Sequence, residues 1–416
     1  MDLTVYPSQI SGVVTSNPSK SHMQRAIVAG LLAGGRSVIT NPSFCEDSKA
    51  ALNVAVDLGA EVEVEKNRVI ISGGFDPVGN ILNCGESGLG LRMFSAVAAL
   101  SEKKITLVGQ GTLKSRSVAM IEKPLTDLGA RITSIQGKLP VTVCGPLTGG
   151  KTIVDGSLSS QFLTGLLMVL PLVEKDSELI VNNLKSRFYI DLTIKVLKDF
   201  GIKLINDNYE HFFIQGGQLY RSREYDIEGD WSGAALLLVA GAIGGEVEIE
   251  NMDINSSQAD RRILDVLEQF GARIAPGINT IRVIKAEMKP FNFDATDSPD
   301  LFPPLVVLAS YAKGESMIKG VSRLAGKESN RAEALIEEFT KVGIKIETDG
   351  DCMIVHGGAV TGGTINSRND HRIAMAAAVA GVGAGGNINI QGYECISKSY
   401  PDFFTDYKKT GGKINE

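Results

Sequence analysis

A pattern that repeats about every seventy residues constrains the fold of this chain more than any other feature. A glycine that follows a helical stretch and precedes a strand recurs in the segments DLGAEVEV, DLGARITS, DFGIKLIN, QFGARIAP, KVGIKIET and KTGGKINE. These glycines are Gly59, Gly129, Gly201, Gly271, Gly343 and Gly411, separated by 70, 72, 70, 72 and 68 residues. Glycine just beyond a helix is a common C-terminal stop, and a fixed period indicates repeated supersecondary units.

A second series of segments lies between these copies. Each segment has the pattern of an apolar helix, a short turn and a strand, as in AIVAGLLAGGRSVIT near the beginning and IAMAAAVAGVGAGGNINI near the end. The helices are rich in Ala and Leu all round, so we expect them to be buried rather than amphipathic. Each repeat therefore contains two helices and three or four strands.

The two ends of the chain favour a closed arrangement. A solenoid needs polar capping repeats, but here the last copy stops at KINE, while DLTVYP and GVVTS supply strands without a repeat of their own. We expect the N-terminal strands to complete the C-terminal repeat. The predicted fold is α/β, with two pseudo-symmetric domains of three repeats each. Residues 18–227 form the first domain, residues 1–17 plus 228–416 form the second, and a hinge lies near 228–233.

Composition excludes several classes of function. A net charge of −6 argues against a nucleic-acid partner bound through a broad basic face. No run approaches the ~18 apolar residues of a membrane span, and MDLT does not begin a signal peptide. The five cysteines are scattered and the four histidines have no zinc-site spacing, so we expect no metal and a reducing, cytoplasmic setting.

The segments in front of the helices carry an excess of cations. Lys20 and Arg25 stand at the start of an apolar helix, where a cation is mildly unfavourable unless an anion binds there. Cations recur in the corresponding segments, as Arg92, Lys114, Arg116, Lys185, Arg187, Lys327, Arg331, Arg368, Arg372 and Lys398. We expect about half of them to be merely solvated. If the helices of both domains direct their N-termini toward the gap between the domains, that gap attracts substrates with several phosphate and carboxylate groups.

Nine motifs resemble, in order, those of the 5-enolpyruvylshikimate-3-phosphate (EPSP) synthase family. They are NPSKSHMQRA, GESGLGLR, DGSLSSQFLTGLL, SRFYIDLT, EGDWSGAA, SPDLFP, GKESNR, NDHRIAM and SKSYPDFF, and they span nearly the whole chain. The resemblance implies two domains of three βαβαββ units each, an inside-out α/β barrel, which agrees with the repeats. It also implies transfer of the enolpyruvyl group of phosphoenolpyruvate to the 5-hydroxyl of shikimate 3-phosphate with release of phosphate. This step of the shikimate pathway leads to chorismate and aromatic amino acids and needs no cofactor.

The resemblance assigns roles to individual residues. Addition followed by elimination needs groups that act as both acid and base; by resemblance these are Lys20, Asp300, which faces the 5-hydroxyl, and Glu328, which faces the methylene carbon. Shikimate 3-phosphate is expected to contact Lys20, Ser21, Arg25, Ser159, Ser160, Gln161, Ser186, Tyr189, Asp300 and Lys327. Phosphoenolpyruvate is expected to contact Lys20, Gly88, Arg116, Gln161, Arg331, Arg372 and Lys398. For His371, a structural role and a proton-handling role both remain open.

A few positions depart from the family pattern. Ser19 stands where Gly is usual, Leu89 where Thr is usual, and Ser117 where Pro is usual. Ser329 and Asn330 replace the common Thr-Asp pair. These residues flank the charged ones, so they bear on phosphoenolpyruvate affinity and glyphosate response more than on the reaction.

Three other functions fit these residues less well. An enolpyruvyl transferase acting on UDP-N-acetylglucosamine normally carries a reactive cysteine in a mobile loop, whereas GTLKSRSVAM has none and contains Arg116. A non-catalytic relative that only binds phosphorylated ligands would have lost Lys20, Asp300 or Glu328, and all three are present. The glycine spacing of GESGLGLR does not fit a dinucleotide-binding loop. We expect the enzyme to be a monomer.

Overall fold

The computed structural model describes residues 2–415. The chain forms two compact units: unit 1 comprises Met1–Ser19 and Glu228–Glu416, and unit 2 comprises Lys20–Ile227. The sequence-based division placed the first boundary at 17/18 and the second at 227/228. The chain passes from one unit to the other at 19/20 and again at 227/228. The two segments at these boundaries are hydrogen-bonded to each other, because the Ser19 amide donates to the Glu228 carbonyl at 2.9 Å. Residues 231–233 of the expected hinge segment begin helix α7 (Trp231–Gly244).

Six sheets with one common topology make up the two units in the described part of the chain. The first sheet of unit 2 contains β14 (Tyr220–Arg221) and β15 (Glu224–Asp226), followed by β3 (Ala33–Thr40), β5 (Arg68–Gly73) and β4 (Glu61–Val64). The second contains β6 (Ile81–Asn83), β7 (Ile105–Val108), β9 (Lys138–Cys144) and β8 (Arg131–Ile135). The third contains β10 (Gly150–Asp155), β11 (Ser177–Asn182), β13 (His211–Ile214) and β12 (Ile205–Asp207).

Unit 1 repeats this arrangement. Its first sheet contains β2 (Ile10–Thr15), β16 (Gly245–Glu250), β18 (Thr280–Ile284) and β17 (Arg273–Pro276). The second contains β19 (Asn292–Asp294), β20 (Glu315–Lys319), β22 (Cys352–His356) and β21 (Lys345–Asp349). The third contains β23 (Gly363–Asn366), β24 (Ile388–Gln391), β1 (Asp2–Tyr6) and β25 (Lys413–Asn415). In every sheet a parallel contact is followed by two antiparallel ones, as in β19–β20–β22–β21. The predicted βαβαββ repeat is therefore confirmed.

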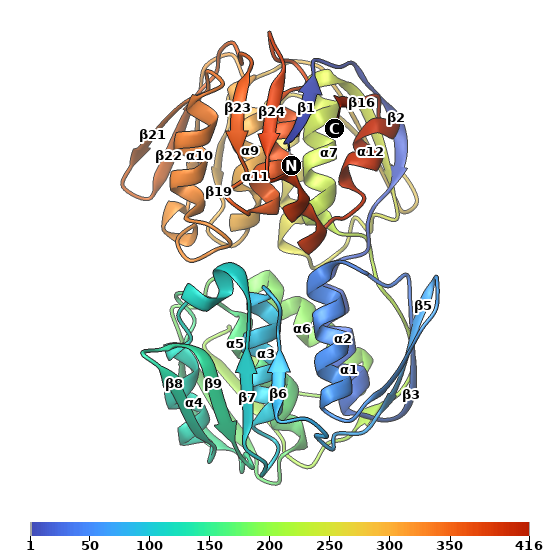
Figure 1. Cartoon of the computed structure of the whole chain (residues 1–416), viewed down its shortest axis with the longest axis vertical. Coiled ribbons are helices and arrows are strands. Elements are labelled where there is room, and N and C mark those ends of the chain that lie inside the picture. Colours follow the sequence, from blue (N-terminus) through green and yellow to red (C-terminus); the bar gives the residue numbers. More distant parts are fainter. Residues whose placement is uncertain (1, 416) are drawn as a thin grey trace. The chain divides into compact units, whose positions relative to one another are not determined.

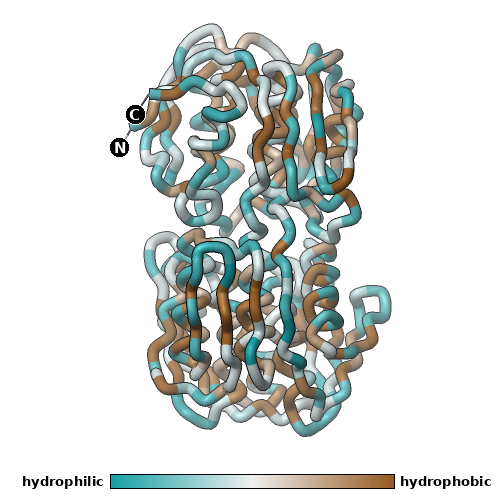
Figure 2. The backbone as a smooth tube through the Cα atoms, turned by 90° about the vertical axis from the view of Figure 1, so that its right-hand side faces the viewer, coloured by the Kyte–Doolittle hydropathy of each residue, from teal (hydrophilic) through white to brown (hydrophobic). Residues whose placement is uncertain are grey.

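The first helix of each repeat is buried. These helices are α1 (Lys20–Leu32), α3 (Gly88–Ala98) and α5 (Gln161–Val169) in unit 2, and α7, α9 (Phe302–Ser310) and α11 (His371–Ala380) in unit 1. Every residue of α3, α9 and α11 is buried. The apolar side chains on all sides of these helices explain why they lie inside each unit (Figure 1), each of which has its own hydrophobic core (Figure 2). This placement is the inside-out arrangement that was predicted.

The second helix of each repeat ends one to three residues before the repeated glycine. These helices are α2 (Glu46–Asp57), α4 (Glu122–Asp127), α6 (Arg187–Asp199), α8 (Ile263–Phe270), α10 (Arg331–Thr340) and α12 (Phe403–Lys409). All six glycines have φ between 86° and 107°, a conformation that other residues rarely adopt. Short 3₁₀ segments complete the chain: η1 (Gly111–Ser115), η2 (Ala119–Ile121), η3 (Leu170–Leu172), η4 (Ala259–Arg262), η5 (Pro299–Leu301), η6 (Val321–Arg323) and η7 (Tyr393–Lys398).

The N-terminal strand closes the last repeat. Strand β1 pairs antiparallel with both β24 and β25, so the chain's first strand lies between two of its last ones. Strand β2 then pairs in parallel with β16 and begins the next repeat. This pairing satisfies backbone groups that an open edge would expose, and it confirms the expectation drawn from the two chain ends.

Candidate active site

The predicted site residues fall into two groups, ten in unit 2 and six in unit 1. In unit 2 they lie at or near the N-terminal ends of α1, α3, α5 and α6 and beside η1: Lys20, Ser21, Arg25, Gly88, Arg116, Ser159, Ser160, Gln161, Ser186 and Tyr189. In unit 1 they lie around the N-terminal ends of α9, α10 and α11 and at the end of η7: Asp300, Lys327, Glu328, Arg331, Arg372 and Lys398. Helix N-termini present free backbone N–H groups, so each group is suited to anions.

Lys20 is held by a carboxylate from α2, the second helix of its own repeat. Its ammonium Nζ lies 2.9 Å from Asp47 Oδ2, and the two side chains are only 16% and 11% exposed. Asp47 lies in the first turn of α2, where its charge also suits the helix end. Sequence reasoning missed Asp47, although acidic residues are common in the first turn of a helix, where it stands.

Arg25 joins three helices inside unit 2. Arg25 is 1% exposed and donates to Thr193 Oγ1 at 2.9 Å and the Tyr189 carbonyl at 3.1 Å on α6, to Thr164 Oγ1 at 3.2 Å on α5, and to the Ser21 carbonyl of its own helix at 2.7 Å. Burial lowers the pKa of Arg25 to about 10, so the group stays charged at neutral pH. Arg25 thus holds the backbone of two other predicted site residues in place.

Two guanidinium groups stand directly against Gly88. A Cβ atom placed on Gly88 would lie 2.8 Å from Arg116 Nη1 and 3.0 Å from Arg92 Nη1, distances too short for a side chain. Arg92 Nη1 also donates to Gln161 Oε1 at 2.7 Å. The first turn of α3 is capped by Ser87, whose Oγ accepts from the Gly90 amide at 3.0 Å. The absent side chain at Gly88 is what allows Arg116 and Gln161 to approach the same helix end.

The serines of this group surround the starts of α5 and α6. Ser159 Oγ accepts from the Gln161 amide at 3.1 Å, and Ser160 occupies the N-cap position of α5. Ser186 adopts a left-handed conformation, with φ 58° and ψ 47°, immediately before α6. Such a conformation is uncommon outside glycine and asparagine and is often found at functional sites.

In unit 1, Asp300 is surrounded by cations. Its Oδ1 lies 2.7 Å from Arg331 Nη1 and 3.3 Å from Lys327 Nζ, and its Oδ2 lies 3.2 Å from Arg372 Nη2. Burial alone would raise the pKa of the Asp300 carboxyl. The neighbouring positive charges, Arg372 first, outweigh burial and hold that pKa well below its usual range. Asp300 is therefore ionised in the ligand-free chain.

Arg331 is the centre of this group. Its side chain is fully buried, and its Nη2 lies 2.6 Å from Glu328 Oε2. Its Nε lies 3.0 Å from Asp370 Oδ2, and its Nη2 also donates to Asp370 Oδ1 at 3.2 Å. Burial works against the charge of Arg331, but attraction to its carboxylates, Asp370 first, raises its pKa above the ordinary value.

The cations of unit 1 differ in their surroundings. Burial lowers the pKa of Lys327, and the charge of Arg331 adds to this effect. Lys398, at the end of η7, donates to the Asn369 carbonyl at 2.9 Å. His371 is the first residue of α11 and is 1% exposed, directly before Arg372.

Sequence reasoning missed two buried carboxylates of unit 1. Asp370 belongs to the NDHR motif but was not singled out, although it bonds Arg331 and also caps α11 by accepting from the Arg372 amide at 3.0 Å. Asp260, in η4, accepts a hydrogen bond from Ser232 Oγ. Burial, and next the negative charge of Asp300, raise the pKa of Asp260. Nothing in the segment SSQADRR distinguishes Asp260 from an ordinary acidic residue in front of a helix.

Comparison with known proteins identifies the family. The model of the EPSP synthase (3-phosphoshikimate 1-carboxyvinyltransferase) family matches residues 5–407. This chain belongs to the EPSP synthase family. The 3-phosphoshikimate 1-carboxyvinyltransferase of Clostridium novyi (strain NT) is 37% identical, over 100% of this chain and 98% of the relative. That of Methanocorpusculum labreanum is 36% identical, over 100% of both chains.

Solved structures agree with this assignment. The EPSP synthase of Acinetobacter baumannii superposes with a TM-score of 0.85 at 26% identity and covers 100% of both chains. The enolpyruvyl transferase NikO from Streptomyces tendae superposes with a TM-score of 0.78 at 16% identity over 100% of this chain and 98% of that one, which shows the shared fold.

Membership of the EPSP synthase family confirms the predicted enzyme and its reaction. The chain is an enolpyruvyl transferase of the shikimate pathway whose substrates are shikimate 3-phosphate and phosphoenolpyruvate. The alternative acting on UDP-N-acetylglucosamine is not favoured. Within residues 2–415, no cluster of three or more His, Cys, Asp or Glu side chains could hold a metal ion. Across the same residues, no helix combines the length and the apolar character that crossing a membrane requires.

Proposed function

We propose that the two groups of residues bind these substrates and move the protons of an addition–elimination reaction. The observation that carries the proposal is the position of Asp300, an ionised carboxylate in contact with Lys327, Arg331 and Arg372. An alcohol proton must leave while the methylene carbon of phosphoenolpyruvate gains one. A carboxylate among anion-binding cations is suited to that exchange.

The proton transfers follow the order of bond changes. Asp300 accepts the proton of the 5-hydroxyl while the hydroxyl oxygen forms a bond to C2 of phosphoenolpyruvate. Glu328 donates a proton to C3, and the tetrahedral ketal results. In the elimination, C3 returns a proton to Glu328, the bond between C2 and the phosphate oxygen breaks, and phosphate leaves with the proton that Asp300 took from the 5-hydroxyl. The substrate anions compensate the nearby cations, which makes the carboxylates more basic than in the ligand-free chain. Lys20, held by Asp47, supplies the third proton-transfer group.

The remaining residues bind and orient the two substrates. Hydroxyl groups of Ser159, Ser160 and Ser186 donate to the shikimate phosphate, and Ser21, Gln161, Tyr189 and Lys327 position the ring. Arg25 contributes by holding Ser21 and Tyr189. Arg116, Arg331, Arg372, Lys398 and the backbone at Gly88 hold phosphoenolpyruvate, because a planar guanidinium matches both phosphate and carboxylate.

We also propose that the enzyme acts as a cytoplasmic monomer. The single chain supplies every residue to which the proposal assigns a role. The cysteines Cys45, Cys84, Cys144, Cys352 and Cys395 are all free thiols, as is usual in a reducing compartment.

Phosphate release with purified protein tests the proposed chemistry. We expect release only when shikimate 3-phosphate and phosphoenolpyruvate are both present, and none when UDP-N-acetylglucosamine replaces the first. Asp300→Asn should lower kcat about 10²-fold or more, on the usual scale for an acid–base group. Asp294→Asn removes a carboxylate whose partner Lys319 is exposed and is the matched control, with kcat unchanged. Equal activity of the two variants would overturn the assignment of Asp300.

A further inference from the structure

The turn in front of α11 has an unusual backbone conformation. Arg368 and Asn369, between β23 and α11, both lie in the left-handed region, with φ of 52° and 58°. The Asp370 amide donates to the Ser367 carbonyl at 2.9 Å, which closes a four-residue turn around them. Positive φ at both central residues is the mark of a type I′ turn, in which Gly, Asn and Asp predominate. Arginine is therefore an unexpected residue at the first central position, and its conformation has to be stabilised by its surroundings.

Glu338 of α10 holds this turn through its side chain. Its Oε1 accepts from Arg368 Nε at 2.9 Å and Nη2 at 2.8 Å, and its Oε2 accepts from the Asn366 amide at 2.9 Å. Arg368 Nη2 also donates to Glu337. Glu338 is 1% exposed, and Lys341 Nζ lies 2.6 Å from its Oε2. Burial would raise the pKa of Glu338, but the hydrogen bonds, that of Lys341 first, outweigh burial and lower it, so the anchor is a charged one.

Helix α10 contacts the turn at two points. It packs beside β23 (Figure 1), and the Arg331 side chain at its start lies 3.0 Å from the Asp370 carboxylate. Glu338 follows Arg331 by seven residues, which is about two helical turns, so both side chains lie on the same side of the helix. The Asn369 carbonyl of the turn accepts from Lys398 Nζ at 2.9 Å. The conformation of the turn therefore sets where a proposed phosphoenolpyruvate ligand is held.

We propose that Glu338 is a positioning residue for phosphoenolpyruvate. By anchoring Arg368 it keeps the turn left-handed, and the turn places Arg372 and Lys398. The proposal rests on the roles in phosphoenolpyruvate binding proposed above for these two cations. Glu338 acts through the backbone between β23 and α11 and not by contact with a substrate. A turn that leaves this conformation part of the time lowers the competent fraction of the enzyme and weakens apparent binding by the same factor.

Two substitutions at Arg368 test the left-handed turn. Arg368→Ala and Arg368→Gly remove the same hydrogen bonds, but glycine adopts a positive φ readily whereas alanine does so at a cost. We expect Arg368→Ala to raise KM for phosphoenolpyruvate about fivefold or more and Arg368→Gly to raise it less, with KM for shikimate 3-phosphate little changed in both. An arginine that acted only by its charge or its hydrogen bonds would give equal values. Equal KM values for phosphoenolpyruvate in the two variants would overturn the role of the turn.

Substitution of Glu338 tests the anchor itself. Glu338→Gln turns an amide N–H toward groups that are themselves donors, so we expect KM for phosphoenolpyruvate to rise about tenfold. The double variant Glu338→Gln/Arg368→Gly should recover most of this loss, because a glycine in the turn has less need of the anchor. A Glu338→Gln variant with the parent value of KM would overturn the proposal. The Arg368 side chain is 33% exposed, so its two variants still decide the question if Glu338→Gln does not fold.

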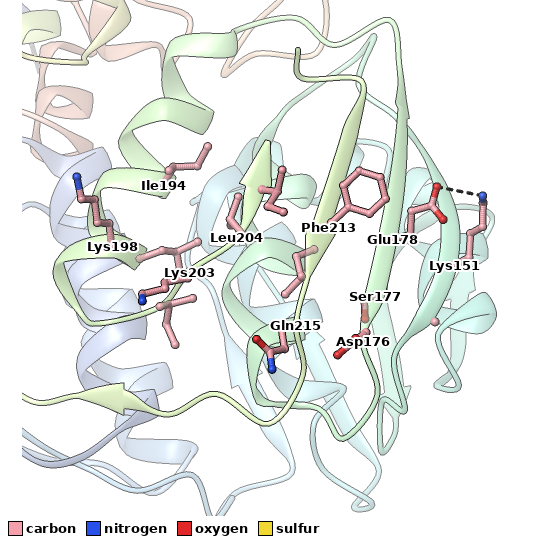
Figure 3. A pocket seen from close by; sticks show the side chains of 15 residues that line it. Lys151, Asp176, Ser177, Glu178, Ile194, Lys198, Lys203, Leu204, Phe213 and Gln215 are labelled. Carbon is pink, nitrogen blue, oxygen red and sulfur yellow. Dashed lines mark hydrogen bonds and ion pairs between the residues drawn. The ribbon is translucent and has the colours of Figure 1, made fainter. Parts of the chain in front are cut away.

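Matched controls separate this effect from general damage. Asn208, between β12 and β13, has φ of 52° and stands at the first central position of a similar turn, in which the Glu210 amide donates to the Asp207 carbonyl at 3.0 Å. Asn208→Ala therefore introduces the same backbone cost outside the candidate site. Glu178→Gln removes a carboxylate that lies 3.0 Å from Lys151 Nζ in unit 2 (Figure 3). Both variants should leave kcat and both KM values unchanged.

Replacement of the two cations keeps this inference apart from the proposed function. Lys398→Met and Arg372→Met should each raise KM for phosphoenolpyruvate more than Glu338→Gln does. If neither raises it, the roles proposed for the cations are wrong, and this inference is wrong with them. If both raise it while Glu338→Gln and Arg368→Ala do not, the cations bind phosphoenolpyruvate and only the positioning role of Glu338 is overturned.

Discussion

Arg331 and Asp370 form an ion pair in which neither side chain is exposed, with Nε of the arginine 3.0 Å from Oδ2 of the aspartate. The second carboxylate oxygen accepts from Nη2 of the same guanidinium at 3.2 Å. This two-point contact fixes the plane of the guanidinium and directs Nη1 toward Asp300 at 2.7 Å. The buried aspartate therefore sets the direction in which Arg331 meets a carboxylate that we place in the reaction.

Loss of the charge of Asp370 should destabilise unit 1. Asp370→Asn leaves a buried guanidinium with one carboxylate fewer, which typically costs about 3 kcal/mol or more. Urea unfolding should show this loss. Asp294→Asn, which breaks the exposed pair with Lys319, should cost less than about 1 kcal/mol. Similar losses in the two variants would mean that the buried pair contributes no more than a surface pair.

Replacement of Glu328 separates its two possible roles. Glu328→Gln keeps the size of the side chain but cannot carry a proton to C3, so we predict a fall in kcat of about 10²-fold or more with substrate binding largely retained. If Glu328 only pairs with Arg331 at 2.6 Å, the variant should instead show a raised KM for phosphoenolpyruvate and a kcat near normal. Steady-state kinetics decides between these outcomes, and Glu333→Gln, at an exposed residue of α10, the helix that begins at Arg331, is the control.

A side chain at Gly88 should disturb phosphoenolpyruvate binding. The added Cβ of Gly88→Ala would lie 2.8 Å from Arg116 Nη1, so the guanidinium must move. We predict a rise of about tenfold in KM for phosphoenolpyruvate and little change in KM for shikimate 3-phosphate. Gly74→Ala, whose Cβ meets no atom within 4 Å, should leave both constants unchanged. An unaltered KM for phosphoenolpyruvate in Gly88→Ala would contradict the proposed position of Arg116.

Stability should fall in mild acid because of His22. The imidazole Nε2 lies 2.7 Å from the Tyr225 hydroxyl, and burial lowers the pKa of His22 to about 3 from an ordinary value of 6.5. The unfolded chain therefore binds a proton that the folded chain does not between these two values, so stability decreases as the pH falls through this window.

The size of this effect follows from the same pKa values. Between pH 6.5 and about pH 4.5 the parent should lose about 2 kcal/mol more stability than His22→Phe, which keeps an aromatic ring against Tyr225. Urea unfolding at the two pH values measures the difference. His211→Phe, at a side chain that is 40% exposed, provides the control. A parent and a His22→Phe variant with the same pH dependence would rule out a neutral, buried His22.

Much of the fold could be predicted because its determinants are local. The six glycines stop helices through their own backbone conformation, and all six have a positive φ in the structure. The apolar character of residues such as those in α7 and α11 on every side predicts burial without knowledge of any neighbour. The cations in front of helices could also be recognised from the local sequence, because Lys20 and Arg25 conflict with the helix dipole unless an anion is near.

The partners of those cations could not be predicted from the sequence. Lys20 meets Asp47 at the start of the other helix of its own repeat, and Arg331 meets Asp370 from the following repeat, because tertiary packing brings these helix ends together. A periodic pattern records which residues begin a helix, but not which of several acidic residues reaches a given arginine. The sequence alone therefore determined the repeats, the buried helices and the residue types of the candidate site. Tertiary structure decided the pairing of charges, because that pairing depends on distances of a few ångströms between segments far apart in the chain.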